Sequence, residues 1–156
     1  MILAVLALIA WFVMIVFAFV RKGMSLNDLI FLYFIIVIIT ITLFTILDIN
    51  LHWVPLTRTV EGSFAMYICR FIVIPFHILM SVCAVHLPQL KSIWRWGIPG
   101  ANLLFLCVED RIYLMADLIT YQSWNELYSF LMYSVFIVLI WWIARWFVGL
   151  DRGGFK

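Results

Sequence analysis

The sequence predicts an all-α integral membrane protein, a single transmembrane domain over residues 1–156 built as a bundle of five helices. Hydrophobic residues make up 67% of the chain and charged residues 12%, whereas a soluble domain carries roughly a quarter charged residues. The apolar residues also form long segments, each near the ~20 residues that cross a bilayer. So few charges cannot cover a water-facing surface, and the composition therefore excludes a soluble domain.

The expected spans cover residues 2–20, 29–52, 63–87, 98–120 and 125–148. The first carries no charged side chain, so we expect it to be retained in the membrane at the periphery of the bundle. Ser25 and Asn27 are candidate N-caps of the second span. In the third, Pro75 removes a helical hydrogen bond and is expected to kink the helix near Phe71.

The fourth segment decides the number of crossings, because Glu109, Asp110 and Arg111 lie in its middle. If residues 98–120 lie at the membrane surface instead, the chain crosses four times. With five crossings one side holds most of the basic residues, namely Arg21, Lys22, Lys91, Arg95, Arg152 and Lys156. The opposite side holds Arg58 beside acidic residues. Since Lys and Arg favour the cytoplasmic side, this pattern predicts five crossings, with the N-terminus outside and the C-terminus inside.

Several classes of function have no support in the sequence. The net charge is +2 and the basic residues are dispersed, so no nucleic-acid partner is expected. Cys69, Cys83 and Cys107 fall in apolar segments without a CxxC pair, and we interpret them as packing residues. Nucleotide-binding and serine-hydrolase motifs are absent as well, so the sequence predicts no cofactor, no metal and no catalytic residue.

Polar side chains at membrane depth are the candidate functional residues, because a charge at the bilayer centre costs about 2.5–3.5 kcal/mol. At about 100° per residue, Glu109, Tyr113 and Asp117 share one face of their helix, Asp110 borders that face and Arg111 points away. This polar face must meet protein or a water-filled cavity.

Two other helices carry matching polar positions. Arg70 and His77 share a face of the third span, and Asp48 and His52 lie on one side of the second. These positions predict a polar cluster in the outer half of the membrane. The candidate binding residues are Arg70, His77, Glu109, Asp110, Tyr113, Asp117, Asp48 and His52.

The cluster has several interpretations that the sequence leaves open. In a structural one, Arg70 pairs with an acid and the network fixes helix packing. In a binding one, Arg70 holds an anionic group in a pocket open to the outside. A third is a small transporter or channel-like protein with a Glu109, Arg70 and His77 relay. A fourth is a membrane enzyme acting on a lipid head group with acid, base or metal-ligating side chains.

A short motif carries a family resemblance. Tyr121-Gln122-Ser123-Trp124-Asn125 is followed by Ser129 and Tyr133 on an apolar helix, and an acid-bearing helix precedes it. Over residues 100–148 the chain resembles a family of small multi-span membrane proteins of spore-forming bacteria. The resemblance implies a bacterial plasma-membrane location. It implies no activity and no catalytic residues.

Together these observations predict a non-enzymatic, multi-pass plasma-membrane protein that acts as a binding or accessory subunit with a polar pocket in the outer half of the membrane. Its expected partners are the lipid bilayer and either further copies of itself or a larger membrane protein.

Overall fold

The computed structural model describes residues 2–20, 23–87 and 89–153. The helices are α1 (Ile2–Phe19), α2 (Leu26–Thr45), η1 (Ile46–Asn50), α3 (Val60–Ile68), η2 (Cys69–Val73), α4 (Ile74–His86), α5 (Ser92–Met115) and α6 (Glu126–Gly153), where η denotes a π-helix. Within these ranges the β pairing consists of one isolated antiparallel bridge, between Leu56 and Ile119. The predicted all-α class is confirmed for the part of the chain that the structure describes.

Four of these stretches are long and apolar enough to cross a membrane: Ile2–Phe19, Leu26–Asn50, Val60–His86 and Glu126–Phe147. The helix α5 has 24 residues, a sufficient length, but Glu109, Asp110 and Arg111 lower its hydropathy. The described chain is therefore a helical bundle of membrane type, with α5 as its one long polar member.

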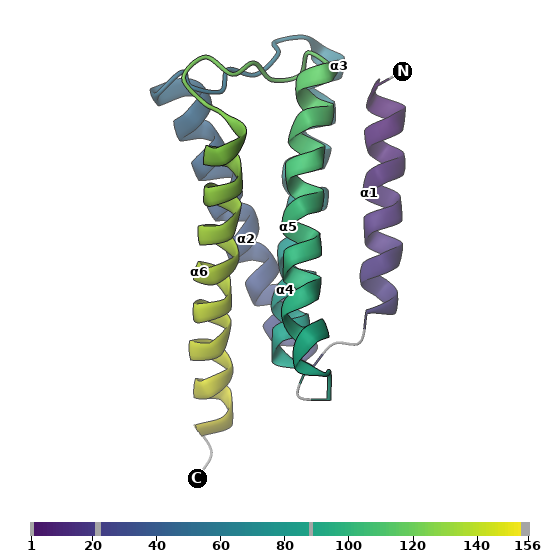
Figure 1. Cartoon of the computed structure of the whole chain (residues 1–156), viewed down its shortest axis with the longest axis vertical. Coiled ribbons are helices and arrows are strands. Elements are labelled where there is room, and N and C mark those ends of the chain that lie inside the picture. Colours follow the sequence, from purple (N-terminus) through teal and green to yellow (C-terminus); the bar gives the residue numbers. More distant parts are fainter. Residues whose placement is uncertain (1, 21–22, 88, 154–156) are drawn as a thin grey trace.

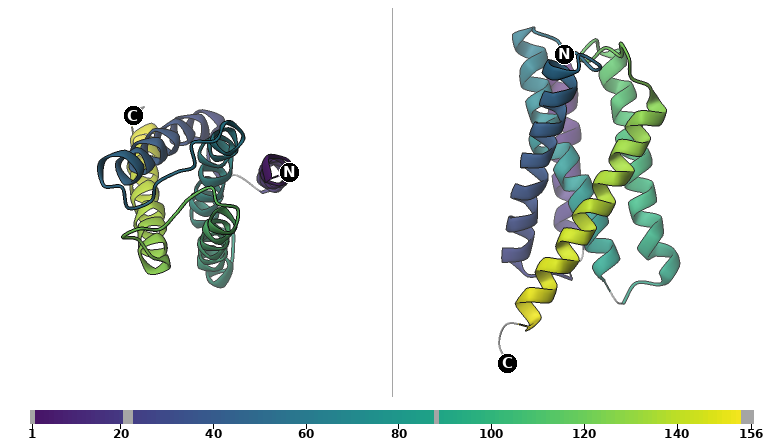
Figure 2. Two further views of the ribbon diagram at one scale, coloured as in Figure 1. Left: turned by 90° about the horizontal axis from the view of Figure 1, so that it is seen from above. Right: turned by 90° about the vertical axis from the view of Figure 1, so that its left-hand side faces the viewer.

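The helices run up and down beside one another, and α5, which packs against α4, extends from one end of the bundle to the other (Figure 1). Seen from above, α1 stands apart at one side (Figure 2). Only Leu6, Ala10 and Val13 of α1 are buried. The third span is the centre of the bundle. In an apolar stretch of 18 residues within it, 67% of the residues are buried, against 17% in α1. The peripheral position expected for the first span is what the structure shows.

The helix α2 begins at a capping box. The Ser25 hydroxyl accepts from the Asp28 amide at 3.2 Å, and the Ser25 amide donates to the Asp28 carboxylate at 3.0 Å. Asn27, the other candidate cap, lies inside the first turn. The helix therefore starts at Leu26, three residues before the predicted boundary, and it ends in a π-helix instead of continuing as an α-helix to His52.

The third span carries its predicted distortion as a π-helix, because η2 contains Phe71 and ends just before Pro75. Pro75 has no N–H to donate to the Phe71 carbonyl four residues earlier. That carbonyl oxygen accepts a hydrogen bond from the Tyr33 hydroxyl of α2 at 2.8 Å. The carbonyl that lost its usual donor at position 75 is thus hydrogen-bonded by the neighbouring helix α2.

The helix α5 begins at Ser92, six residues before the predicted start at 98, so the expected connection over 89–97 is wrong for most of its length. The Arg95 guanidinium donates to the Leu87 carbonyl through Nε and Nη2, at 3.4 and 3.3 Å, and closes the turn from α4. The helix ends at Met115 instead of 120, and Asp117 follows with a φ of 53°.

The two loops at the N-terminal end of the bundle bind each other. The Thr57 amide donates to the Leu118 carbonyl at 2.9 Å, and the Thr120 amide donates to the Pro55 carbonyl at 3.1 Å. We call residues 51–59 and 116–125 the paired loops. Of the residues used above to predict topology, Arg21, Lys22 and Lys156 lie outside the described residues.

Candidate functional site

The structure distributes the predicted site residues over several places. Asp48 and Arg70 line one cavity, whereas Glu109, Asp110 and Tyr113 are buried on α5 and His77 is buried on α4. His52 and Asp117 are exposed in the paired loops. A single cluster of eight residues is therefore not formed.

The cavity beside Arg70 lies between α2 and α3 and has a volume of about 230 Å³. The polar and charged side chains that line it are Thr45, Asp48, Thr57, Arg58, Ser63, Tyr67 and Arg70. We call it the Arg70 cavity. Asp48 lies in η1 and Arg70 in η2, so the two π-helices supply one charged residue each. π-helical turns occur frequently at functional sites.

The guanidinium group of Arg70 is contacted on its planar face by an aromatic ring, and it lacks hydrogen bonds along its edge within the described residues. The guanidinium carbon lies 4.7 Å from the centre of the Phe44 ring, a cation–π contact with α2. Nε and Nη2 are buried and have no hydrogen-bond partner among the described residues. An unmade hydrogen bond at a buried charged group costs more than the ~1–3 kcal/mol of a neutral one. The side chain is therefore short of acceptors.

Asp48 is satisfied by other groups. Its Oδ1 accepts from the Leu56 amide at 2.9 Å and from Arg58 Nη2 at 3.1 Å. Arg58 is 73% exposed at the side chain and Asp48 8%. Asp48 pairs with Arg58, and Arg70 forms no ion pair with any residue in the described ranges. The cavity carries two guanidinium groups and one carboxylate, an excess of one positive charge.

A second polar centre surrounds Asp110, which is 5% exposed. Tyr133 of α6 donates to Oδ1 at 2.9 Å, and Tyr121 donates to Oδ2 at 3.3 Å. The Tyr121 hydroxyl also lies 3.0 Å from the Ser129 hydroxyl, which accepts from the Trp124 indole at 2.8 Å. These hydrogen bonds connect α5, the loop after it and α6.

Tyr121 itself lies in the loop. Burial raises the pKa of its phenol, and the nearby Asp110 carboxylate raises that pKa further. The phenol is therefore a neutral donor across the physiological pH range.

The sequence analysis placed Asp110 at the border of the polar face and did not foresee these partners. Tyr121, Trp124, Ser129 and Tyr133 are nevertheless the residues that carried the family resemblance. These polar residues were visible in the motif, but their spacing along the chain does not show that their side chains surround Asp110.

Glu109 is 1% exposed and has a single weak partner. The Tyr113 hydroxyl donates to Oε2 at 3.4 Å, while Oε1 has no hydrogen-bond partner among the described residues. Arg111 points the other way and pairs with Glu126 at the surface of the bundle. Glu109 and Arg70 therefore do not form the ion pair of the structural interpretation.

His77 is 4% exposed and makes local contacts. Its Nδ1 donates to the Val73 carbonyl at 2.8 Å, and its ring stacks on Phe105 with centroids 5.0 Å apart. Neither of these two contacts is to Glu109 or Arg70. No three His, Cys, Asp or Glu side chains come together as a metal site within the described residues.

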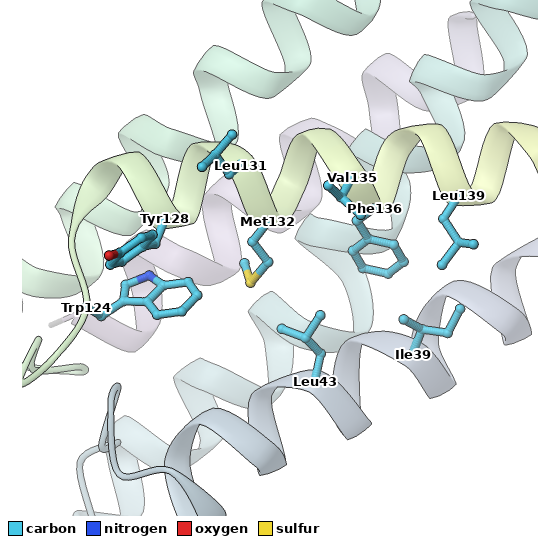
Figure 3. Close-up of a pocket in the computed structure, with 9 residues that line it drawn as sticks. All are labelled: Ile39, Leu43, Trp124, Tyr128, Leu131, Met132, Val135, Phe136 and Leu139. Carbon is cyan, nitrogen blue, oxygen red and sulfur yellow. The ribbon is translucent and has the colours of Figure 1, made fainter.

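A larger cavity, of about 360 Å³, lies between α2 and α6 (Figure 3). Ile39 and Leu43 of α2 face Met132 and Phe136 of α6 across it. No charged side chain lines it. It offers apolar contact without a group that would select a ligand, so the Arg70 cavity is the better candidate site.

Searches of known protein families, curated proteins and solved structures find no match to this chain.

Proposed function

We propose that this chain is a non-enzymatic, multi-pass membrane protein that acts as a binding or accessory subunit and holds an anionic group in the Arg70 cavity. One observation carries the proposal: Arg70 lines a cavity, and its buried Nε and Nη2 have no hydrogen-bond partner within the part of the chain that the structure describes. A carboxylate or phosphate oxygen is the acceptor that a guanidinium prefers.

The charges around the cavity favour the same function. Asp48, the acid that lines the cavity with Arg70, is bound to Arg58. Neither Asp48 nor Glu109 is within ion-pair distance of Arg70 in the described structure. An external anion would therefore meet an uncompensated positive charge at the cavity.

We propose five crossings, with the N-terminus outside. The paired loops support this, since hydrogen bonds between Pro55 and Thr120 and between Thr57 and Leu118 require both loops on one side of the membrane. The first loop follows the second span and the other follows α5. Two loops on one side then imply that α5 crosses. The resemblance at residues 121–133 supports a bacterial plasma membrane, with further copies or a larger protein as partner.

The test is ligand-dependent stability of the purified chain in detergent. We expect at least one of two anionic probes, inorganic phosphate or dioctanoyl phosphatidylglycerol, to raise Tm. A ligand at a hundredfold excess over Kd stabilises by about 2.7 kcal/mol, which is a shift of several degrees. Arg70→Gln should abolish the shift.

Arg145→Gln is the matched control, because Arg145 also lies over an aromatic ring, that of Trp141 at 5.8 Å, but outside the cavity. It should retain the shift. The proposal fails if neither probe raises Tm, or if Arg70→Gln responds as the unmodified chain does.

A transport function is the second candidate. It is favoured by Oε1 of Glu109, which lies at membrane depth and has no hydrogen-bond partner in the described ranges. It predicts proton-coupled flux in liposomes that Glu109→Gln abolishes while the protein stays folded. Absence of flux in every oligomeric state would dismiss it. It ranks second because no hydrogen bond or ion pair joins Glu109, Arg70 and His77 within the described residues.

A further inference from the structure

We propose that the anion bound in the Arg70 cavity is the phosphate group of an anionic membrane lipid, which enters sideways from the bilayer between α2 and α3. This inference rests on the proposed function and narrows its ligand to one class, the phosphodiester lipids.

The position of the cavity favours a ligand that comes from the membrane. Its walls belong to Leu26–Asn50 and Val60–His86, two stretches that are able to cross a bilayer. The loop residues Thr57 and Arg58 close its outer end. The cavity thus lies where the apolar span meets the outer boundary, which is the level of lipid headgroups.

The mouth of the cavity is apolar on the membrane side. Ile49 and Tyr67 line it and are 54% and 56% exposed. The Ile49 side chain and the Tyr67 ring suit acyl chains, and the Tyr67 hydroxyl adds one donor at the rim. A polar interior with an apolar rim matches a charged headgroup that carries hydrocarbon.

The size of the cavity sets how much of the lipid it takes. About 230 Å³ is below the ~300–1,000 Å³ of pockets that enclose a drug-sized ligand. The cavity therefore accommodates a headgroup, and the chains remain outside against the exposed rim.

The charge of the lining matches a phosphodiester. Arg58 and Arg70 contribute two positive charges and Asp48 one negative charge, which leaves an excess of one. A phosphodiester carries one negative charge at neutral pH. The hydroxyls of Thr45 and Ser63 also line the cavity, and hydroxyls donate well to phosphate oxygens.

Asp48 has a defined part in this arrangement. It holds Arg58 through Oδ1 at 3.1 Å, and its charge opposes an anion beside Arg70. Arg58 is largely exposed, so it is free to turn from Asp48 to a bound phosphate. Removal of the Asp48 charge should therefore strengthen lipid binding, the opposite of what loss of either arginine does.

The experiment measures binding of three probes to the purified chain in detergent. Dioctanoyl phosphatidylglycerol has headgroup and chains, sn-glycerol 3-phosphate has the phosphate without chains, and dioctanoylglycerol has the chains without phosphate. We expect the phosphatidylglycerol to bind at least tenfold more tightly than either fragment, because only it meets both the guanidinium groups and the apolar rim.

Three variants assign the binding to the cavity. Arg70→Gln should weaken phosphatidylglycerol binding tenfold or more, Asp48→Asn should tighten it severalfold, and Arg145→Gln should leave it within twofold. If Arg70→Gln fails to fold, Arg58→Gln replaces it, since that side chain is exposed and its loss should weaken binding severalfold.

The outcomes separate the two proposals. Equal binding of glycerol phosphate and the lipid, both lost in Arg70→Gln, overturns the lipid inference and leaves the proposed function standing. Binding of dioctanoylglycerol as tight as that of the lipid overturns the phosphate inference. Absence of binding by every anionic probe overturns both proposals. Both also fail if Arg70→Gln and Arg58→Gln bind phosphatidylglycerol as tightly as the unmodified chain does, or more tightly.

Discussion

Asp110 and Glu109 are neighbours on α5 that are buried to similar degrees but differently satisfied. Asp110 accepts from Tyr133 and Tyr121, whereas Tyr113, at 3.4 Å, is the one donor to Glu109 among the described residues. Hydrogen bonds to a charged group contribute about 1.5–3 kcal/mol. We therefore interpret the Asp110 network as a structural connection between α5 and α6.

Replacement of Tyr133 by Phe tests this connection. The change keeps the ring and removes the donor 2.9 Å from Asp110 Oδ1, so we expect a loss of about 1.5–3 kcal/mol in the free energy of unfolding. The measurement is reversible denaturation in detergent micelles.

Tyr128→Phe is the matched control, because Tyr128 lies on the same helix, is 47% exposed and makes no described hydrogen bond through its hydroxyl. It should change stability by less than about 0.5 kcal/mol. Equal losses in the two variants would show that the Asp110 network does not stabilise the bundle.

Helical spacing predicted part of this site. It placed Glu109 and Tyr113 toward protein, and both are buried. It left Asp110 at the border of that face, because periodicity describes one helix and says nothing about side chains that arrive from elsewhere. Tyr121 comes from a loop and Tyr133 from another helix. Arg58 was missed as a cavity residue for the same reason.

At the scale of elements, the third span shows how a helix tolerates an internal proline. Pro75 leaves the Phe71 carbonyl without its usual donor, and Tyr33 of α2 donates to it. The sequence predicted the position of the distortion. It did not predict a π-helix, because Pro75 accounts for the missing hydrogen bond but not for the wider turn at Cys69–Val73.

We expect Tyr33→Phe to reduce stability by about 0.5–1.5 kcal/mol, since it removes one neutral hydrogen bond. In a Pro75→Ala background the residue at 75 has an N–H that is able to reach the Phe71 carbonyl. Tyr33→Phe should then cost less, by about 0.5 kcal/mol or more. A double-mutant cycle measures the difference, and simple additivity of the two changes would contradict the explanation.

At the scale of the whole molecule, the number of crossings depends on α5. Composition indicated a membrane protein, and the basic residues indicated an orientation, but neither gives contacts between distant segments. The hydrogen bonds between the paired loops are such a contact between distant segments. They join a loop after α2 to the loop after α5, which a four-crossing chain would place on opposite sides.

Labelling of single cysteines in intact cells tests the topology. Thr120→Cys in a paired loop and Lys91→Cys in the α4–α5 turn are the two sites, in a background without the three native cysteines. With five crossings and the N-terminus outside, a membrane-impermeant thiol reagent should label Thr120→Cys and reach Lys91→Cys only after the cells are opened. The same accessibility at both sites would place α5 on the membrane surface.

The two π-helices that hold Asp48 and Arg70 also determine which way the neighbouring helical turns face, and therefore which side chains line the cavity. A π-turn takes up an extra residue, and one residue of an α-helix turns the chain by about 100°. If the residues of Cys69–Val73 instead formed an unbroken α-helix, the extra residue would no longer be absorbed and α3 would rotate by about that angle relative to α4. Ser63 and Met66 would then turn away from α2 while the core of α4 kept its place. The same residues wound as an unbroken α-helix would keep the bundle and lose the cavity, whereas loss of the one extra residue would preserve both.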